Sequence, residues 1–294
     1  MKIAVIGAGA LGTFYGAMIA AYNEDTTLVC RERDVETLKK GITVTGDIEK
    51  SAHPHISSKP PRADVVFITV KAYDVASAAG SLSLDPGALV IVIHNGLGSD
   101  EVAASILGRG HVGVGVSYSG VTFLAPGKVK LNGYTETVLG SIEPEVHKRM
   151  GEALRILERA GLKARIADDI RAAQWEKMYA NVGINAITAI TGLTNGMPLE
   201  VPELKETVEA AVTEAGQVSR AMGIKTHVDP VDNTLKVIRD TYNNRSSMLQ
   251  DVSKGKRTEI DALNGKISEL GRKAGIPTPV NDTITGLVKG IEKR

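Results

Sequence analysis

The segment with the most recognisable chemistry is a glycine-rich run near the N-terminus, Gly7-Ala8-Gly9-Ala10-Leu11-Gly12. Its spacing is that of dinucleotide-binding loops, in which the first glycine permits a tight turn and the second lets the backbone approach a pyrophosphate. The third glycine lets the following helix pack closely on the strand, and free N–H groups at the start of that helix favour an anion. The six residues therefore predict a nicotinamide dinucleotide site; the alternative is a glycine-rich turn that binds nothing.

The end of the second predicted strand indicates which nicotinamide cofactor is bound. Enzymes that use NAD usually place an acidic residue there, where it holds the 2′-hydroxyl of the ribose. Here Cys30 and Arg31 occupy that point, and the first acidic residue is Glu32. An arginine suits a 2′-phosphate, so the sequence favours NADPH/NADP. Two alternatives stay open, because Glu32 could still reach a ribose and Arg31 could be a solvated surface side chain.

Two further polar positions follow apolar runs that are typical of buried parallel strands. Lys71 follows the run over 64–70, and His94-Asn95-Gly96 follows the run over 89–93. Ligands of open α/β sheets bind outside the carboxyl ends of the strands. Lys71 and Asn95 are therefore candidates for contact with the ligands, although each could also be an ordinary polar residue at the end of a strand.

A stripe of polar residues lies in a segment that is otherwise largely apolar. Lys177, Asn181 and Asn185 recur at every fourth position, which puts them on one face of a predicted helix. A buried ammonium or amide group without a partner is costly. The stripe therefore indicates the wall of a polar cavity, or else a buried hydrogen-bond network that ties helices together.

A second polar cluster lies nearer the C-terminus, over residues 243–251 and 258–265. Glu259 stands beside a predicted apolar helix face, four residues before Leu263. From the pattern alone, Glu259 is better explained by an acidic residue at a helix N-terminus, where the helix dipole favours it, than by a functional role. The six histidines show no metal-ligand spacing.

The elements that must position these residues fall into two classes. The first part of the chain alternates strands and helices, whereas the chain from about residue 168 onward has helical patterns almost throughout. We therefore predict an α/β fold with a Rossmann-type doubly wound sheet over 1–167, followed by an all-helical substrate or catalytic domain over 168–294. The strands are predicted over 2–6, 26–30, 64–70, 89–93, 111–117 and near 137–139, and the helices over 13–21, 145–160, 169–191, 201–222, 232–249 and 257–272, with a last short helix after these.

The composition narrows the class of protein. The chain has 294 residues with 35 Lys and Arg against 34 Asp and Glu, a formal net charge of +1, which argues against nucleic-acid and membrane-surface partners. Hydrophobic residues make up 43%, which excludes a disordered chain. No apolar run is long enough to span a membrane, the N-terminus does not read as a signal peptide, and the single cysteine fits a reducing compartment. We therefore expect a cytoplasmic protein.

Several of these segments together closely resemble the 2-dehydropantoate 2-reductase (ketopantoate reductase) family, and the likeness runs along nearly the whole chain. The glycine loop is not specific to that family, but the polar stripe and the two C-terminal motifs are. The stretch over 115–124 follows the family only loosely. The matching residues are the glycine loop, Val70-Lys71-Ala72, His94-Asn95-Gly96, Trp175 with the polar stripe, Asn195-Gly196, Ser246-Ser247-Met248-Leu249-Gln250-Asp251 and Thr258-Glu259-Ile260-Asp261 with Asn264-Gly265.

The resemblance implies an NADPH-dependent reduction of ketopantoate to (R)-pantoate on the route to pantothenate and coenzyme A. It makes Lys177 the general acid and Glu259 the residue that binds the substrate hydroxyl, and it puts Lys71 and Asn95 at the junction of cofactor and substrate. A homodimer is an open expectation, whereas no metal is implied. The residues that would line the substrate site are Asn95, Asn181, Asn185, Asn195, Asn244 and Ser247.

Two other functions remain open from the sequence. One is an NAD(P)-dependent reductase that acts on another 2-oxo or 3-hydroxy acid. The other is a nicotinamide-binding regulator without catalysis, which would keep the glycine loop but has no need of Lys177, the asparagines and Glu259 together.

Overall fold

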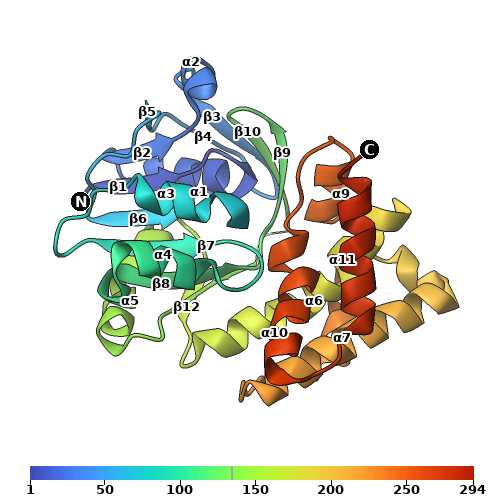
Figure 1. Ribbon diagram of the computed structural model, residues 1–294. Helices are drawn as coiled ribbons and strands as arrows, with labels where there is room; N and C mark the ends of the chain where they lie inside the picture. The colour runs from blue at the N-terminus through green and yellow to red at the C-terminus, as the bar shows by residue number, and fades with distance from the viewer. Residues whose placement is uncertain (134) are drawn as a thin grey trace. The chain divides into compact units, whose positions relative to one another are not determined.

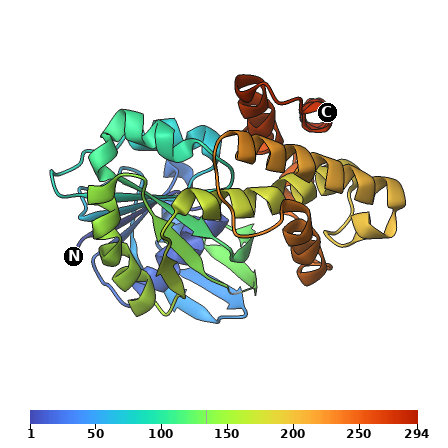
Figure 2. The ribbon, with the colours of Figure 1, turned by 90° about the horizontal axis from the view of Figure 1, so that it is seen from below.

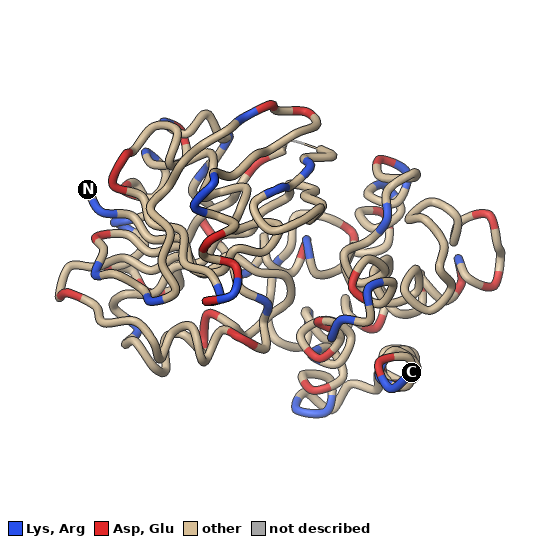
Figure 3. The backbone as a smooth tube through the Cα atoms, turned by 90° about the horizontal axis from the view of Figure 1, so that it is seen from above, with Lys and Arg blue, Asp and Glu red and all other residues tan. Residues whose placement is uncertain are grey.

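The chain forms two compact units (Figure 1). The computed structural model describes residues 1–133 and 135–294. Unit 1 consists of residues 1–94 and 98–170, and unit 2 of residues 95–97 and 171–294. Acidic and basic residues are interspersed along both units (Figure 3). Among the described residues, no helix is long and apolar enough to cross a membrane.

The main sheet of unit 1 has eight strands in the order β12-β11-β8-β7-β6-β1-β2-β5. All neighbouring strands are parallel except β8 and β11, which pair antiparallel. The chain order reverses between β1 and β6, which is the point where such sheets bind their ligands. The strands are β1 Ile3–Ile6, β2 Thr26–Val29, β5 His55–Ser57, β6 Val65–Ile68, β7 Leu89–Ile93, β8 Val112–Ser117, β11 Thr137–Gly140 and β12 Ala164–Ile166.

Helices cover both faces of this sheet, which explains why its central strands are apolar at every position. On one face, α1 and α5 pack on side chains such as Val5, Phe67 and Ile91; on the other face, α3 and α4 pack on Ile6 and Ile68. The predicted Rossmann-type fold is therefore confirmed. The helices of unit 1 are α1 Ala10–Ala20, α2 Val35–Leu38, α3 Val75–Gly80, α4 Ser99–Leu107 and α5 Pro144–Arg159, with short 3₁₀ helices η1 Glu32–Asp34, η2 Ala72–Asp74 and η3 Arg109–His111.

Unit 1 also contains a second sheet that the sequence did not predict. Its four strands run in the order β4-β3-β10-β9, with β10 parallel to β3 and antiparallel to β9. Val44, Val129 and Leu131 of this sheet belong to the same core as α1, so α1 is buried on nearly every side. The strands are β3 Ile42–Gly46, β4 Lys50–Ala52, β9 Gly120–Ala125 and β10 Lys128–Gly133.

Unit 2 is helical throughout, as predicted for this half of the chain (Figures 1 and 2). Its core is formed by apolar side chains of α6, α7, α10 and α11, among them Tyr179, Val212, Ile267 and Val288. The long helix α6 begins at Ile170, the last residue of unit 1. The helices are α6 Ile170–Thr191, α7 Pro202–Ala221, α8 Pro230–Asp240, α9 Ser247–Val252, α10 Asn264–Ala274 and α11 Pro279–Ile291, with 3₁₀ helices η4 Met197–Glu200 and η5 Ile260–Ala262.

Two helix predictions in this unit were wrong in their extent. The helix expected over 232–249 is two helices, because the chain leaves the helix after Asp240 and the Ser246 hydroxyl starts a new one by accepting a hydrogen bond from Leu249 N–H. The helix expected over 257–272 begins only at Asn264. The preceding residues instead form η5, where the Thr258 hydroxyl accepts from Ile260 N–H.

Candidate functional site

The glycine loop lies between β1 and α1, and each of its three glycines has a different surrounding. Gly7 has a φ of +104°, and a Cβ there would lie 2.6 Å from Val70 Cγ1. A Cβ on Gly12 would lie 1.7 Å from the Gly7 carbonyl oxygen, so only glycine lets α1 start so close to the strand end. A Cβ on Gly9 would meet no heavy atom within 4 Å.

The space at Gly9 suits an anion. Gly9 is the N-cap residue of α1, and no side chain caps this helix start. The first N–H groups of the helix therefore need an outside partner. Ala8, Ala10 and Leu11 complete the loop, so the loop offers backbone donors rather than charged side chains to a pyrophosphate.

The residues expected to contact the remainder of the cofactor follow β2 and β6, the strands on either side of β1. Arg31 comes two residues after β2, and its exposed guanidinium Nη2 lies 3.8 Å from Asp74 Oδ2. Lys71 and Asp74 follow β6, and Lys71 is half-buried. Because β2 and β6 both pair parallel with β1, these residues and the glycine loop share one edge of the sheet.

The two residues next to Arg31, Cys30 and Glu32, have structural positions. Glu32 is exposed and begins η1. Cys30 is buried, and burial raises the pKa of its thiol to about 11, with Asp34 and Glu32 adding to the rise. Cys30 is therefore a neutral core residue rather than a nucleophile.

The polar stripe of α6 lies in unit 2, where it meets Asn95. Lys177 Nζ donates a hydrogen bond to Asn95 Oδ1 over 2.8 Å, although the two residues are 82 positions apart. Burial lowers the pKa of Lys177 to about 8, and the negative charge of Glu259 opposes that fall. The structure thus brings together an ammonium, an amide and a buried carboxylate from three separate segments.

Glu259 is not explained as a helix-terminus acid. It stands at the N-cap position of η5, a three-residue 3₁₀ helix, and its side chain makes no capping hydrogen bond there. Its side chain is 6% exposed, and its charge acts on Lys177. A buried carboxylate whose charge acts on a desolvated ammonium is typical of a functional site.

Further along the stripe, Asn185 Nδ2 donates to Asn181 Oδ1 over 3.4 Å. One helical turn later, the Thr188 and Ser246 hydroxyls are hydrogen-bonded at 2.6 Å, which ties α6 to the start of α9. Ser247 is the first residue of α9, so this contact positions it.

Asn195 and Asn244 are held together by the backbone. Asn195 N–H donates to the Asn244 carbonyl over 2.9 Å, and Gly196 N–H donates to the Tyr242 carbonyl over the same distance. Asn195 Nδ2 also donates to the Thr241 hydroxyl over 3.1 Å. The Tyr242 ring lies so close to Gly196 that a Cβ there would come within 2.0 Å of it.

Two amide atoms of this group are buried without a hydrogen-bond partner, Asn181 Nδ2 and Asn195 Oδ1. Buried polar atoms in folded proteins nearly always have a partner, so each exception needs an explanation. The stripe therefore does not form a fully closed hydrogen-bond network.

The sequence pattern alone assigns no role to Gly96. Gly96 has a φ of +91°, and a Cβ there would lie 2.3 Å from the Ala262 carbonyl oxygen. That oxygen also accepts a hydrogen bond from Leu97 N–H over 3.3 Å. Gly96 therefore lets the segment that carries Asn95 lie directly on the turn that carries Glu259.

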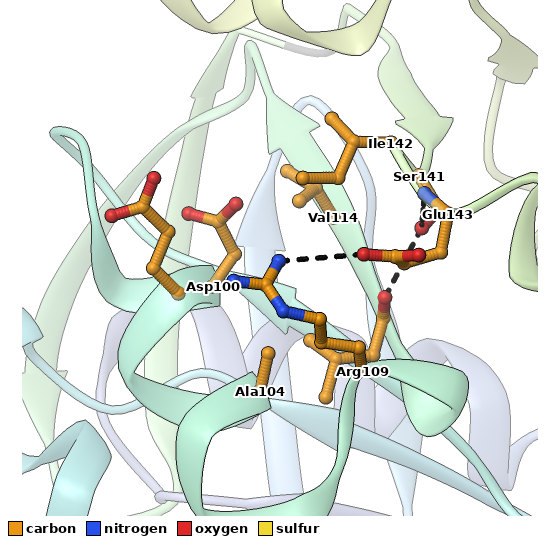
Figure 4. Close-up of a pocket in the computed structure, with 9 residues that line it drawn as sticks. Asp100, Ala104, Arg109, Val114, Ser141, Ile142 and Glu143 are labelled. Atoms are coloured by element: carbon orange, nitrogen blue, oxygen red, sulfur yellow. Dashed lines mark hydrogen bonds and ion pairs between the residues drawn. The ribbon is translucent and has the colours of Figure 1, made fainter.

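A separate depression in unit 1 contains none of the predicted site residues (Figure 4). It is lined by Asp100, Glu101 and Ala104 of α4, with Arg109 and Glu143 beside them. Arg109 Nη1 pairs with Glu143 Oε1 at 3.3 Å across it. The depression thus holds one ion pair, and it presents no chemistry related to the site.

Comparison with known proteins identifies the relatives of both units. Residues 3–144 match the family model for ketopantoate reductase PanE/ApbA, and residues 169–292 match the model for its C-terminal part. The 2-dehydropantoate 2-reductase of Archaeoglobus fulgidus is 36% identical over 99% of this chain and 98% of its own length.

Solved structures with the same fold include two different activities. The crystal structure of a PanE/ApbA family ketopantoate reductase from Ralstonia eutropha JMP134 has a TM-score of 0.91 and 30% identity, covering 100% of this chain and 99% of its own. A ternary structure of D-mandelate dehydrogenase with NADH and anilino(oxo)acetate has a TM-score of 0.92 and 24% identity, covering 100% and 98%.

Proposed function

The chain belongs to the ketopantoate reductase family, and from that premise we propose that it reduces ketopantoate (2-dehydropantoate) to (R)-pantoate with NADPH, as a step toward pantothenate and coenzyme A. The observation that carries the proposal is the ammonium of Lys177, which is desolvated, hydrogen-bonded to Asn95 and within reach of the charge of Glu259. An acid of this kind is what the reduction of a carbonyl requires.

In this mechanism, the bound nicotinamide supplies the hydride to C2 of the 2-oxo acid. Negative charge develops on the C2 oxygen, where Lys177 Nζ stabilises it and then delivers the proton, which gives the hydroxyl of the product. With its pKa lowered to about 8, Lys177 is protonated at neutral pH and still gives up its proton more readily than an exposed lysine.

The neighbours of Lys177 orient it and hold the substrate. Asn95 Oδ1 accepts one hydrogen of the ammonium and so orients it. The unpartnered Asn181 Nδ2 is available to the carboxylate or the carbonyl of the substrate. Asparagine side chains bind these groups without adding a charge that would compete for the proton.

The remaining residues of the site complete the substrate contacts in this proposal. Asn185, Asn195, Asn244 and Ser247 line the site, with Asn195 Oδ1 as an open acceptor. Glu259 accepts a hydrogen bond from the hydroxyl that ketopantoate carries at the end away from its carboxylate. A carboxylate buried in this way rejects a substrate that leaves it without a partner.

For the cofactor, the glycine loop over residues 7–12 would hold the pyrophosphate at the open N-terminus of α1. Arg31 would bind the 2′-phosphate of NADPH, since no carboxylate ends β2 and the guanidinium is exposed. Lys71 follows β6 at the same edge and would contact the cofactor where it meets the substrate.

The test is the loss of NADPH absorbance with a panel of 2-oxo acids: ketopantoate, trimethylpyruvate, which lacks its hydroxyl, and phenylglyoxylate, the 2-oxo acid related to mandelate. We expect ketopantoate to give the highest kcat/KM, by roughly 10²-fold or more over trimethylpyruvate. A matched variant, Glu259→Gln, should lose activity on ketopantoate and narrow that gap.

Other outcomes of the panel would replace the proposal. A higher kcat/KM for phenylglyoxylate would indicate a mandelate-type reductase. NADPH binding without turnover of any acid in the panel would indicate a regulator. Equal discrimination by the wild type and Glu259→Gln would remove Glu259 from substrate recognition.

A further inference from the structure

One short turn in unit 2 carries Glu259 and also supports the segment of Asn95. Ala262 N–H and Leu263 N–H both donate to the Glu259 carbonyl, over 2.9 and 3.1 Å, which closes the turn over 259–263. On its other side, the Ala262 carbonyl accepts from Leu97 N–H and lies against Gly96. Any movement of this turn would therefore move two groups that act on Lys177.

Asn264, directly after the turn, attaches it to the helix that carries Lys177. Asn264 is 0% exposed. Its Nδ2 donates to the Val182 carbonyl in α6 over 3.1 Å and to Asn281 Oδ1 over 3.0 Å. Val182 follows Asn181 in the chain, so the attachment lies in the middle of the polar stripe.

The second partner of Asn264 is itself fixed. Asn281 Nδ2 donates to the Ala211 carbonyl over 2.9 Å and to Glu214 Oε2 over 2.7 Å. The buried Glu214 carboxylate also accepts from Val280 N–H and Asn281 N–H, at 2.9 and 3.0 Å, and so caps α11 from α7. The amide of Asn281 is therefore a rigid anchor rather than a mobile neighbour.

Stability alone does not explain an asparagine at position 264. Its Oδ1 is buried and has no hydrogen-bond partner, and an unpaired buried acceptor costs about 1–3 kcal/mol. The amide cannot turn over to pair it, because both groups next to Nδ2 are acceptors. The two directed hydrogen bonds are kept in spite of this penalty, and they point to a geometric role.

We propose that Asn264 is a positioning residue, which fixes the 259–263 turn on α6 and thereby sets the places of the Glu259 carboxylate and the Asn95 amide relative to Lys177. The proposal rests on the proposed function, since it assigns Asn264 to the same site without any contact to the substrate. A displacement of about 1 Å in a catalytic geometry can reduce turnover by roughly 10²-fold. Such a shift would also lower the pKa of Lys177 further, because the opposing charge of Glu259 would be more distant.

The test begins with Asn264→Leu, which removes both hydrogen bonds but keeps a side chain of similar volume. We expect kcat/KM for ketopantoate to fall roughly 10²-fold, with the Kd for NADPH unchanged. The matched control is Ser268→Ala, one turn further along α10, where a buried hydroxyl has no partner. It should keep wild-type kcat and KM.

A double-mutant cycle separates positioning from a general loss of packing. If Asn264 acts through Glu259, then Asn264→Leu combined with Glu259→Gln should lose less kcat/KM than the product of the two single losses. Additive losses would overturn the inference. If Asn264→Leu does not fold, Asn264→Ser serves in the same cycle, because its shorter hydroxyl cannot reach both acceptors.

The wild type distinguishes this failure from that of the proposed function. A wild-type protein that turns over ketopantoate while the cycle is additive overturns only the role of Asn264. A wild-type protein without turnover of any 2-oxo acid overturns the proposed function, and the inference with it.

Discussion

The surroundings of Lys177 predict how the reduction depends on pH. Lys177 must be an ammonium to donate its proton, and burial lowers its pKa from the ordinary 10.5 to about 8. At that pKa, about nine tenths of the protein carries the ammonium at pH 7 and about one tenth at pH 9. We therefore expect kcat/KM for the reduction at pH 9 to be about a tenth of its value at pH 7.

The variant Glu259→Gln tests the electrostatic part of this argument. Glu259 is the charge that keeps the pKa of Lys177 from falling further, so its removal should move the descending limb of kcat/KM to lower pH. Oxidation of the product with NADP needs the neutral amine as a base and should rise with pH over the same range. The assay follows NADPH absorbance in both directions from about pH 6 to about pH 10, since kcat/KM reports the free enzyme.

The same pKa predicts a change in stability, with a definite sign. The folded-state pKa lies below the unfolded value, so between about 8 and 10.5 the unfolded chain binds more protons, and the free energy of unfolding rises with pH. Compared with Lys177→Met, the wild type should gain at most about 3 kcal/mol across that range, and less where water screens the half-buried side chain. Urea unfolding of both proteins at several pH values measures this difference. Two results would refute the reasoning. One is a difference in unfolding free energy between wild type and Lys177→Met that does not change with pH. The other is a pH profile of kcat/KM whose descending limb is the same in Glu259→Gln as in the wild type.

Four further substitutions test the proposed roles of residues in the two units. Arg31→Ala should raise the Kd for NADPH by roughly 10-fold or more and leave that for NADH nearly unchanged, as one lost charge-assisted contact predicts; equal losses by fluorescence titration would show that Arg31 does not bind the 2′-phosphate. Gly9→Ala should keep the wild-type melting temperature but weaken NADPH binding, because its Cβ meets only open space at the start of α1, whereas Gly12→Ala should destabilise the fold itself, because its Cβ would lie 1.7 Å from a carbonyl oxygen. A Gly9→Ala protein with normal NADPH affinity would contradict the pyrophosphate site. Gly96→Ala should lower kcat while retaining NADPH affinity. At a φ of +91°, its Cβ would collide with the Ala262 carbonyl and displace Asn95, which accepts the hydrogen bond of Lys177. An unchanged kcat would show that the segment of Asn95 tolerates the shift.

Six strands of the main sheet were predictable because their signals are local, whereas its edge strands β5 and β12 were not predicted. A buried strand, the glycine loop and an apolar helix follow one another within the first twenty residues. The runs over 65–68 and 89–93 are apolar at every position because helices cover both of their faces. Such patterns depend only on nearby residues and on burial.

The second sheet was not predictable in the same way. Its strands are short and far apart in sequence, since β3 pairs with β10 more than eighty residues later. Their pairing comes from contact with α1, which a reading of neighbouring residues does not reveal. The ends of α8 and α10 were missed for a related reason, because single hydroxyls at Ser246 and Thr258 decide where the helices start and stop.

The residues of the candidate site were likewise predictable only where the signal is local. The stripe of Lys177, Asn181 and Asn185 was visible because one helix sets its spacing. The partners of the stripe come from distant loops, and only the family resemblance pointed to Asn195, Asn244 and Glu259. The contact of Lys177 with Asn95 needs residues 95–97 to belong to unit 2, and nothing in the sequence around them indicates this.

Under the proposed function, the two units would bind their ligands by different physical means. Among the described residues, all five buried side-chain polar atoms without a partner lie in unit 2, on Asn181, Asn195, Asn264, Ser268 and Thr285. Unit 1 would bind the cofactor with backbone N–H groups at a helix start, which remain hydrated until the ligand arrives and cost the fold little. Unit 2 would bind the substrate with buried amides and a desolvated ammonium, whose penalty is present in the free protein and is offset by the packing of its helices. Replacing the unpartnered amides by apolar residues should accordingly lower turnover far more than it lowers the stability of the fold. In unit 1 the two roles fall on different residues, because Gly12 shapes the turn and Gly9 would meet the cofactor.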